Sequence, residues 1–162
     1  MSHSLGVRIL ATGVRFLRHE VQAIEPAILE LVADASEELH LAVYLLGDDA
    51  GPLVDLLEKA VARGVRVLVV VSDLTRQGRE TVRRLQEARR AGGDVRIVEF
   101  RDHEGGVLHA KVVVADRRRA VVGSANLTWG GLRGNHEIAV LVEGEPAWRL
   151  AALVEALARP AT

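Results

Sequence analysis

Two side chains that could hold a phosphate between them lie close together in the second half of the chain. His109 and Lys111 are separated by one residue in a segment, VLHAKVVVA, whose apolar composition predicts a β-strand. Side chains two residues apart on a strand point to the same face. Because neighbouring cations repel one another unless an anion lies between them, the spacing of this imidazole and this ammonium points to phosphate chemistry.

A polar turn follows the next predicted strand and could reach the same phosphate. Gly123, Ser124 and Asn126 come at the end of that strand and lead into a short helix or loop. Such a turn can present backbone N–H groups, a hydroxyl and an amide to an anion. Ser124 and Asn126 are also common turn and helix-capping residues, and without His109 and Lys111 that structural role would be the better interpretation.

Two carboxylates receive different predicted roles. Asp116 comes seven residues after His109, ~23 Å along a strand at ~3.3 Å per residue, which is too far to touch the same phosphate. We therefore assign Asp116 to the hairpin turn, where Asp commonly accepts hydrogen bonds from backbone N–H groups. Glu137, on the following strand, is the best acidic candidate to hold the second ring nitrogen of His109 and fix its tautomer. An ordinary strand carboxylate is the alternative.

Residue rarity draws attention to the same window. Lys59 and Lys111 are the only lysines of the chain, and Asn126 and Asn135 are the only asparagines. Three of these four residues fall between positions 109 and 137, although compositional drift alone would scatter them. The window is therefore where we look for chemistry.

The complete pattern resembles the HKD signature of the phospholipase D superfamily. The fixed positions stand at the usual spacing and are His109-x-Lys111, Asp116 after four residues, and Gly123-Ser124-x-Asn126 after six more. The pair Asn135-x-Glu137 resembles the segment after the motif in the small bacterial nucleases of this superfamily. The likeness extends over nearly the whole chain through its strand and helix pattern, but only residues 109–137 are specific.

This resemblance implies a two-step hydrolysis of a phosphodiester without a metal. One histidine attacks phosphorus to form a phosphohistidine, a second histidine protonates the leaving oxygen, and water then enters with that second histidine as base. In the small nucleases, a glutamate placed like Glu137 supports the catalytic histidine. We therefore expect no cofactor and no metal site, and the sequence contains no HExxH-like ligand spacing.

The motif occurs once, whereas the implied reaction needs two such histidines. The histidines that lack a lysine two residues later are His3, His19, His40, His103 and His136. A second copy of the chain must then supply the other imidazole, and a two-fold dimer brings equivalent sites together across its axis. We expect a homodimer in which one His109 is the nucleophile, the other is the general acid, and the two Lys111 side chains neutralise the phosphate.

The elements that must position these side chains alternate between strands and helices. Strands are predicted at residues 6–10, 14–18, 38–46, 65–72, 94–100, 107–115, 119–123 and 136–142. Helices are predicted at residues 25–36, from Pro52 to a stop at Gly64, at residues 78–91, and from Pro146 onward. This pattern predicts an α/β fold, a mixed β-sheet flanked by helices on both faces, as one domain over residues 1–162. By resemblance it is the phospholipase D/nuclease-like fold.

Composition excludes several classes of protein. With 162 residues, of which 49% are hydrophobic, the chain has the size of one ordinary domain with a real core. It has no cysteine, which excludes disulfides and thiolate metal sites and fits an expected cytoplasmic location. No apolar run reaches the ~18 residues of a membrane span. The N-terminus lacks the pattern of a secretory signal, so we expect no membrane anchor.

Charge gives a weaker indication of the substrate. The net charge of −1 does not by itself indicate nucleic-acid binding. Arginines nevertheless crowd two segments, at residues 76–90 and 117–119. These clusters are either a solvated surface or a track for a polyanion backbone.

We therefore expect a homodimeric nuclease or other phosphodiesterase that acts on DNA or RNA. His109, Lys111 and Glu137 are the expected catalytic residues, and Lys111, Ser124 and Asn126 the expected phosphate ligands. Two alternatives stay open. A phospholipid-cleaving or phosphatidyl-transferring enzyme shares the chemistry, but no amphipathic membrane-binding stretch is visible. A non-catalytic nucleic-acid-binding module of a larger defence or DNA-processing assembly would not need the complete motif.

Overall fold

Seven valine- and leucine-rich segments form one mixed β-sheet in the computed structural model, which describes residues 6–160. Such runs favour strands because branched side chains pack well on a pleated surface. The spatial order of the sheet is β1-β7-β6-β5-β2-β3-β4. The strands are β1 (Val7–Thr12), β2 (Glu38–Val43), β3 (Arg66–Val71), β4 (Val95–Glu99), β5 (Lys111–Ala115), β6 (Arg119–Gly123) and β7 (Glu137–Glu143).

The directions of these strands bring distant segments to the same end of the sheet. β2, β3 and β4 are parallel, whereas β5 is antiparallel to β2, and β6 and β7 continue the alternation. The register pairs Val43, the last residue of β2, with Lys111, the first residue of β5. We call this the Lys111 end of the sheet. The opposite end, where β5 turns into β6, is the Asp116 end.

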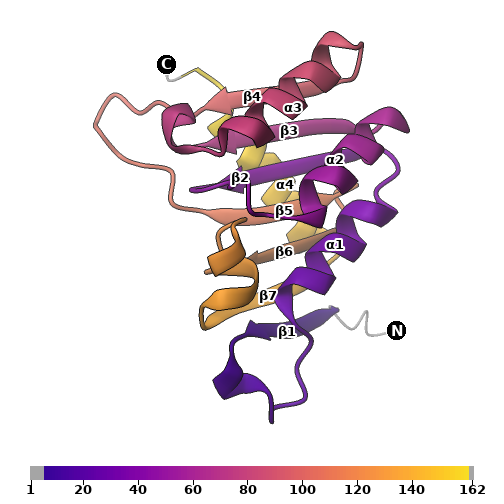
Figure 1. Ribbon diagram of the computed structural model, residues 1–162, viewed down its shortest axis with the longest axis vertical. Coiled ribbons are helices and arrows are strands. Elements are labelled where there is room, and N and C mark those ends of the chain that lie inside the picture. The colour runs from indigo at the N-terminus through magenta and orange to yellow at the C-terminus, as the bar shows by residue number, and fades with distance from the viewer. Residues whose placement is uncertain (1–5, 161–162) are drawn as a thin grey trace.

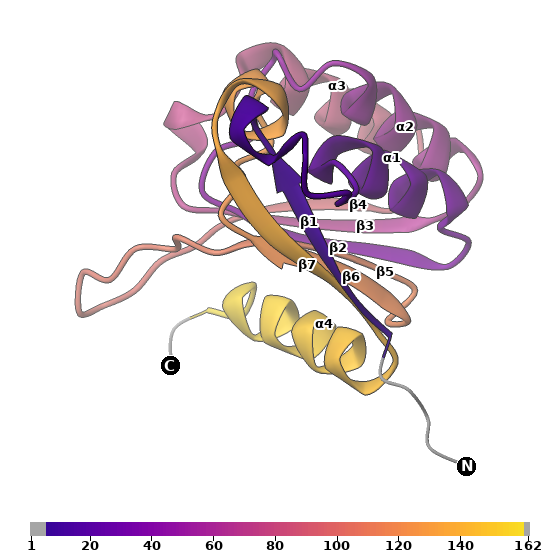
Figure 2. The same ribbon diagram turned by 90° about the horizontal axis from the view of Figure 1, so that it is seen from below.

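Helices cover the two faces of the sheet unequally. Within the described residues, α1 (Ile24–Asp34), α2 (Pro52–Ala62) and α3 (Arg79–Arg90) lie on one face, and α4 (Glu145–Leu157) lies on the other (Figures 1 and 2). Pro52 and Pro146 stand in the first turns of α2 and α4, where the backbone N–H has no partner within the helix. The predicted mixed sheet with helices on both faces is confirmed.

Apolar side chains fill both layers between the sheet and the helices. The layer under α1, α2 and α3 is built mainly of leucine and valine and includes Leu31, Leu41, Leu57, Val69 and Val113. The layer under α4 uses smaller residues and includes Ala42, Val70, Val114, Ala120, Ala147 and Ala151. Small side chains on both the sheet and the helix let α4 lie close to the strands.

The predicted strand at residues 14–18 is wrong. This segment begins with a 3-10 helix, η1 (Val14–Phe16), in which Phe16 N donates to Gly13 O at 3.0 Å. Leu17 is 81% exposed, so the apolar residues here do not mark a segment buried in the sheet. A short apolar run does not by itself distinguish a strand from a turn that happens to expose such residues.

Two neighbouring strands are shorter than predicted, for one shared reason. β2 already ends at Val43, and β5 begins only at Lys111, its partner in the register. Beyond Val43 the chain leaves the sheet because Leu45 N donates to Asn126 Oδ1 at 3.3 Å. A strand partner for residues before Lys111 is therefore missing on this side, and His109 lies just before β5 rather than on it.

Candidate active site

The predicted site residues converge at the Lys111 end of the sheet, with one exception. At this end β2 stops, β5 starts, β6 stops and β7 starts (Figure 1). The site is formed by residues 109–111, residues 123–126 and Glu137. The pairing of β2, β5, β6 and β7 brings them together. Asp116 is the exception and lies at the opposite end.

His109 and Lys111 touch one another directly. Lys111 Nζ lies 3.0 Å from His109 Nδ1 and donates to the backbone carbonyl of His109 at 2.7 Å. The imidazole is exposed to solvent, whereas the lysine is half-buried. Although His109 is not part of the strand, its side chain still shares the space of Lys111, so the two groups can approach one phosphate together.

The environment of Lys111 disfavours its charge. Burial lowers the pKa of the Lys111 ammonium, and the negative charge of Glu137 only partly opposes that effect. No ion pair engages this lysine within residues 6–160. A bound anion would supply the missing countercharge, because an opposite charge at close range favours the protonated form.

The turn after β6 is closely packed at Gly123. A Cβ added to Gly123 would lie 2.5 Å from the backbone oxygen of Ile138 and from Cβ of Ala139, so only glycine fits beside β7. Ser124 N donates to Ile138 O at 3.1 Å, and its hydroxyl donates to Glu137. The glycine thus lets Ser124 emerge at the end of the sheet, exposed beside the start of β7.

The side chain of Asn126 connects two loops at the site. Its Oδ1 accepts a hydrogen bond from Leu45 N at 3.3 Å and so ties the turn after β6 to the end of β2. Nδ2 of Asn126 donates no hydrogen bond within the described part of the chain, which leaves that amide group available to a ligand. The residue therefore combines the turn-forming role with the capacity for the predicted phosphate contact.

Glu137 lies at the site but does not contact His109. Its carboxylate accepts hydrogen bonds from the hydroxyl of Ser124 and from Asn135 Nδ2, the latter at 3.2 Å. Between residues 6 and 160, the polar group beside the ring nitrogens of His109 is Lys111. The orienting contact expected between Glu137 and the imidazole is thus absent from this arrangement, and the role remains a proposal.

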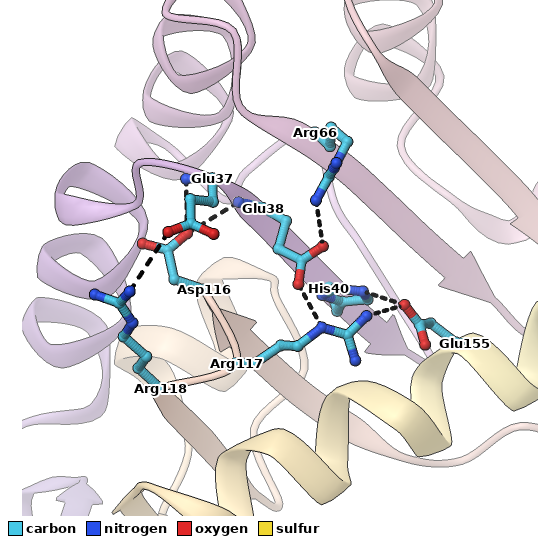
Figure 3. A network of polar contacts seen from close by, with 8 residues as sticks. All are labelled: Glu37, Glu38, His40, Arg66, Asp116, Arg117, Arg118 and Glu155. Atoms are coloured by element: carbon cyan, nitrogen blue, oxygen red, sulfur yellow. Dashed lines mark hydrogen bonds and ion pairs between the residues drawn. The ribbon is translucent and has the colours of Figure 1, made fainter.

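Asp116 anchors the Asp116 end of the sheet (Figure 3). Its carboxylate accepts hydrogen bonds from the backbone N–H groups of Ser36, Glu37 and Glu38 at 3.0, 2.8 and 2.9 Å. Figure 3 shows the bonds from Glu37 and Glu38. Burial acts to raise the pKa of the Asp116 carboxyl, but the bonds from Glu38, Ser36 and Glu37 outweigh it, and the pKa is lowered. The residue stands at the β5–β6 turn, and its partners are the two residues before β2 and the first residue of β2.

Two residues at the site, Tyr44 and Arg76, were not identified from the sequence pattern. The ring of Tyr44, directly after β2, lies 4.9 Å from that of His109 between centroids, and Arg76 Nη1 donates to Tyr44 Oη at 2.6 Å. Tyr44 is the only tyrosine of the chain, so the rarity that marked the lysines and asparagines could have found it. Arg76 carried no such signal, since arginine is abundant.

Five of the nine arginines in the two clusters are paired with acidic side chains, and Arg118, which lies 3.5 Å from Glu37, is one of them. Ion pairs join Arg83 to Glu80 and Glu87, Arg84 to Asp55 and Glu58, Arg117 to Glu38 and Glu155, and Arg119 to Asp34 and Glu30. For these residues the arrangement favours a solvated surface over a track for a polyanion. Arg76 is different, because its side chain turns toward Tyr44.

Neither a metal-binding cluster nor a membrane-spanning helix is found in residues 6–160. These residues contain no cluster of three or more His, Cys, Asp or Glu side chains able to hold a metal ion. They also contain no helix with the length and apolar character needed to cross a bilayer.

Comparisons with known proteins agree with the fold and with the motif. A family model described as "Cardiolipin synthase, PLD-like domain" matches residues 28–158. The mouse protein named 5'-3' exonuclease PLD4 is 31% identical over 134 residues, which cover 75% of this chain and 26% of that protein. This chain thus spans about a quarter of the length of that relative.

Two solved structures share the fold. The phospholipase D family member Nuc from Salmonella typhimurium matches with a TM-score of 0.72 at 19% identity, covering 94% of this chain and 93% of that one. NucT from Helicobacter pylori matches with a TM-score of 0.73 at 12% identity, covering 94% and 96%. In both, the similarity runs over nearly the full length of the two chains.

Proposed function

The chain belongs to the phospholipase D superfamily, and we propose that it is a metal-independent phosphodiesterase, specifically a nuclease that hydrolyses DNA or RNA. The observation that carries the proposal is the contact between His109 and Lys111 at an open end of the sheet, with Ser124 and Asn126 beside them. The name of the mouse relative, an exonuclease, supports nucleic acid as the substrate class.

The proposed reaction has two steps. A ring nitrogen of His109 attacks phosphorus, the bond from phosphorus to the leaving oxygen breaks, and a second imidazole gives that oxygen a proton. Water then attacks the phosphohistidine while the second imidazole takes its proton, and the phosphorus–nitrogen bond breaks. Lys111 neutralises the charge on the phosphoryl oxygens, for which its desolvated ammonium is well suited.

Ser124 and Glu137 act together in this proposal. The hydroxyl of Ser124 now donates to Glu137. When a phosphate arrives, the hydroxyl can donate to a phosphoryl oxygen instead, and the carboxylate is then free to accept a hydrogen bond from an imidazole. The orienting role predicted for Glu137 would therefore arise on substrate binding.

A second copy of the chain supplies the second imidazole. Within residues 6–160 the ring of His109 lies against Tyr44 and no other aromatic or histidine ring. His40 is bonded to Glu155 at the Asp116 end and cannot reach the site, and His3 lies outside the described residues. The exposure of His109 leaves it accessible to a symmetry-related copy. We also propose that this dimer resides in the cytoplasm.

A phospholipid substrate is the second candidate, and two observations favour it. The matching family model is described by the name of cardiolipin synthase. An apolar groove of about 790 Å³ between α4 and the β4–β5 loop, lined in part by Phe100, Ala110 and Leu157, could take an acyl chain. It opens on the α4 face, however, away from the shared space of His109 and Lys111.

The proposed function is tested by incubation with single- and double-stranded DNA and RNA in EDTA. Wild type is compared with His109→Ala and with His19→Ala as a matched control, since His19 is also exposed. We expect cleavage that survives the chelator, disappears in His109→Ala and persists in His19→Ala. Cleavage that needs a divalent metal, or that His109→Ala retains, would refute the mechanism, and activity confined to labelled phospholipid vesicles would favour the second candidate.

The shared site has its own test. Sedimentation velocity should find a dimer at the concentration of the assay, and activity should be bell-shaped in pH because one imidazole must be neutral while the other is protonated. Full specific activity in a sample that sediments as a monomer would exclude the shared site. Loss of either branch of the pH profile would exclude the acid–base pair.

A further inference from the structure

Tyr44 forms one wall of the candidate site. Its ring lies 4.9 Å from the imidazole of His109, at an angle of 53° between the planes. Lys111 Nζ lies 5.5 Å from the centroid of the same ring. Both groups of the catalytic pair thus rest against one aromatic side chain, which the sequence motif does not include.

Arg76 approaches the same tyrosine. Its Nη1 donates to Tyr44 Oη at 2.6 Å, and its Cζ lies 5.1 Å from the ring centroid. A guanidinium at this distance is attracted by the aromatic ring as well as by the hydroxyl. Two cations, Arg76 and Lys111, therefore lie within 5.5 Å of one ring centroid.

The loop that carries Arg76 is held in place by hydrogen bonds. It forms the 3-10 helix η2 (Leu74–Arg76), whose first turn is capped by Asp73 through Thr75 N at 2.8 Å. The buried Gln77 donates to the backbone oxygens of Tyr44 and Asp73 at 3.2 and 2.6 Å. These bonds fix the loop after β3 to the loop after β2, so the position of Arg76 beside Tyr44 is built into the fold.

The charge of Arg76 is available to a ligand. Within residues 6–160 it forms no ion pair, whereas Arg83 and Arg84 on the following helix are both paired with carboxylates. Hydrogen bonds from Thr75 lower the pKa of Asp73, and Arg76 adds a smaller effect without direct contact. The guanidinium is also exposed, so it can bind an anion without first breaking a salt bridge.

We propose that Arg76, positioned by Tyr44, binds the phosphate next to the one that reacts and thereby selects a polynucleotide over an isolated diester. The inference rests on the proposed function and adds its substrate class. A nucleic-acid strand presents regularly spaced phosphates, so one can face His109 and Lys111 while its neighbour faces Arg76. A phospholipid with a single phosphodiester offers nothing to this second cation.

The test compares two substrates in EDTA. One is a single-stranded oligonucleotide, and the other is bis(p-nitrophenyl) phosphate, which has one phosphodiester and no neighbouring phosphate. The ratio of kcat/KM for the oligonucleotide to kcat/KM for the small diester should fall about 10-fold in Arg76→Gln, mainly through KM. Tyr44→Phe, which removes only the hydroxyl that holds Arg76, should lower the ratio less. Arg76→Lys should recover part of it because the charge is kept.

A matched control and a binding measurement complete the design. Arg83→Gln removes an arginine of α3 that is already paired, and it should leave the ratio unchanged. In fluorescence anisotropy, the slope of log affinity against log salt for a labelled oligonucleotide should decrease in magnitude by about 0.7 in Arg76→Gln and not in Arg83→Gln. Circular dichroism melts check that each variant is folded.

Each outcome decides the proposal. An unchanged ratio and an unchanged salt slope in Arg76→Gln would overturn it. So would an equal loss on both substrates, or an equal loss on phosphatidylglycerol vesicles, because Arg76 would then act on the reacting phosphate itself. If wild type cleaves neither substrate in EDTA, the proposed function fails, and the salt slope still decides whether Arg76 contacts the strand.

Discussion

The two ends of the sheet use the same kinds of charged residue in opposite ways. At the Asp116 end, Glu38 is paired with Arg66 and Arg117, and Glu155 with Arg117 and His40 (Figure 3). At the Lys111 end, Lys111 and Arg76 form no ion pair within the described residues. Charges that are matched within the chain hold it together, whereas charges left unmatched remain free to bind something else.

The ion pairs at the Asp116 end join elements that the apolar layer under α4 also holds together. Arg117, from the β5–β6 turn, bonds Glu38 on β2 at 2.6 Å and Glu155 on α4. His40, only 4% exposed, reaches Glu155 at 3.2 Å. The network thereby ties α4, the one described helix on its face, to the sheet. The comparison predicts that substitutions at the two ends separate into losses of activity and losses of stability.

The largest effect is expected for Lys111→Met. Phosphodiesterase activity should fall about 10²–10³-fold, because a preorganised positive charge on the phosphoryl group is lost. The melting temperature should stay equal or rise, since burial disfavours the Lys111 charge in the folded state.

The assay for this variant is hydrolysis of bis(p-nitrophenyl) phosphate together with a thermal melt. Lys59→Met is the control, as Lys59 is the other lysine and is exposed on α2. A clear fall in melting temperature for Lys111→Met would mean that the charge of Lys111 stabilises the fold. The proposed difference between the two ends of the sheet would then be wrong.

A smaller effect of the opposite kind is expected for Arg117→Met. Removing the guanidinium leaves Glu38 and Glu155 without their shared partner, and the free energy of unfolding should fall by about 1–3 kcal/mol. Activity per folded molecule should not change. Urea unfolding and the diester assay measure the two quantities, and Arg118→Met, an exposed neighbour with one contact at 3.5 Å, is the control. Reduced kcat in the folded variant would show that the two ends are coupled.

The smallest effect is expected for Asp116→Asn, and it should depend on pH. Because the folded state lowers the pKa of Asp116, its carboxylate stabilises the fold above the unfolded pKa of about 3.9, and this contribution is lost as pH falls through the folded value. The variant should be about 1–2 kcal/mol less stable at pH 7, with the difference shrinking below about pH 4.

Urea titrations at neutral and acidic pH measure this difference. Asp49→Asn, on an exposed loop, serves as the control and should show no such trend. A constant difference between Asp116→Asn and wild type at all pH values would mean that the charge of Asp116 contributes nothing to folding.

The sequence predicted the sheet and its helices well because those elements depend on local apolar patterns. The strand at residues 65–72 and the helix opened by Pro52 correspond to β3 and α2. The error at residues 14–18 came from apolar residues that stay exposed. The early end of β2 could not be predicted, because it depends on the hydrogen bond from Leu45 to Asn126, far away in sequence.

The candidate site was predictable in its residue types but not in its contacts. The spacing of His109 and Lys111 placed them together, and their contact agrees with that expectation. Two contacts depend on the order of the strands in the sheet. They are the hydrogen bond from Ser124 to Glu137 and the hydrogen bond from Arg76 to Tyr44. A pattern along one chain does not contain that order, so the bond expected between Glu137 and His109 rested on the need of a nucleophilic imidazole for an acceptor and on the resemblance, without knowledge of the neighbouring contacts.

The pairing of β1 with β7 has a consequence for how the protein is made. The register joins Thr12 to Glu137 and Val7 to Val142, so the first described strand pairs with the last. During synthesis β1 must wait, unpaired, until β7 has left the ribosome, and exposed strand edges in that interval are prone to aggregate. The nascent chain also cannot place Glu137 beside Ser124 before that moment, so the candidate site cannot assemble until β7 has been synthesised.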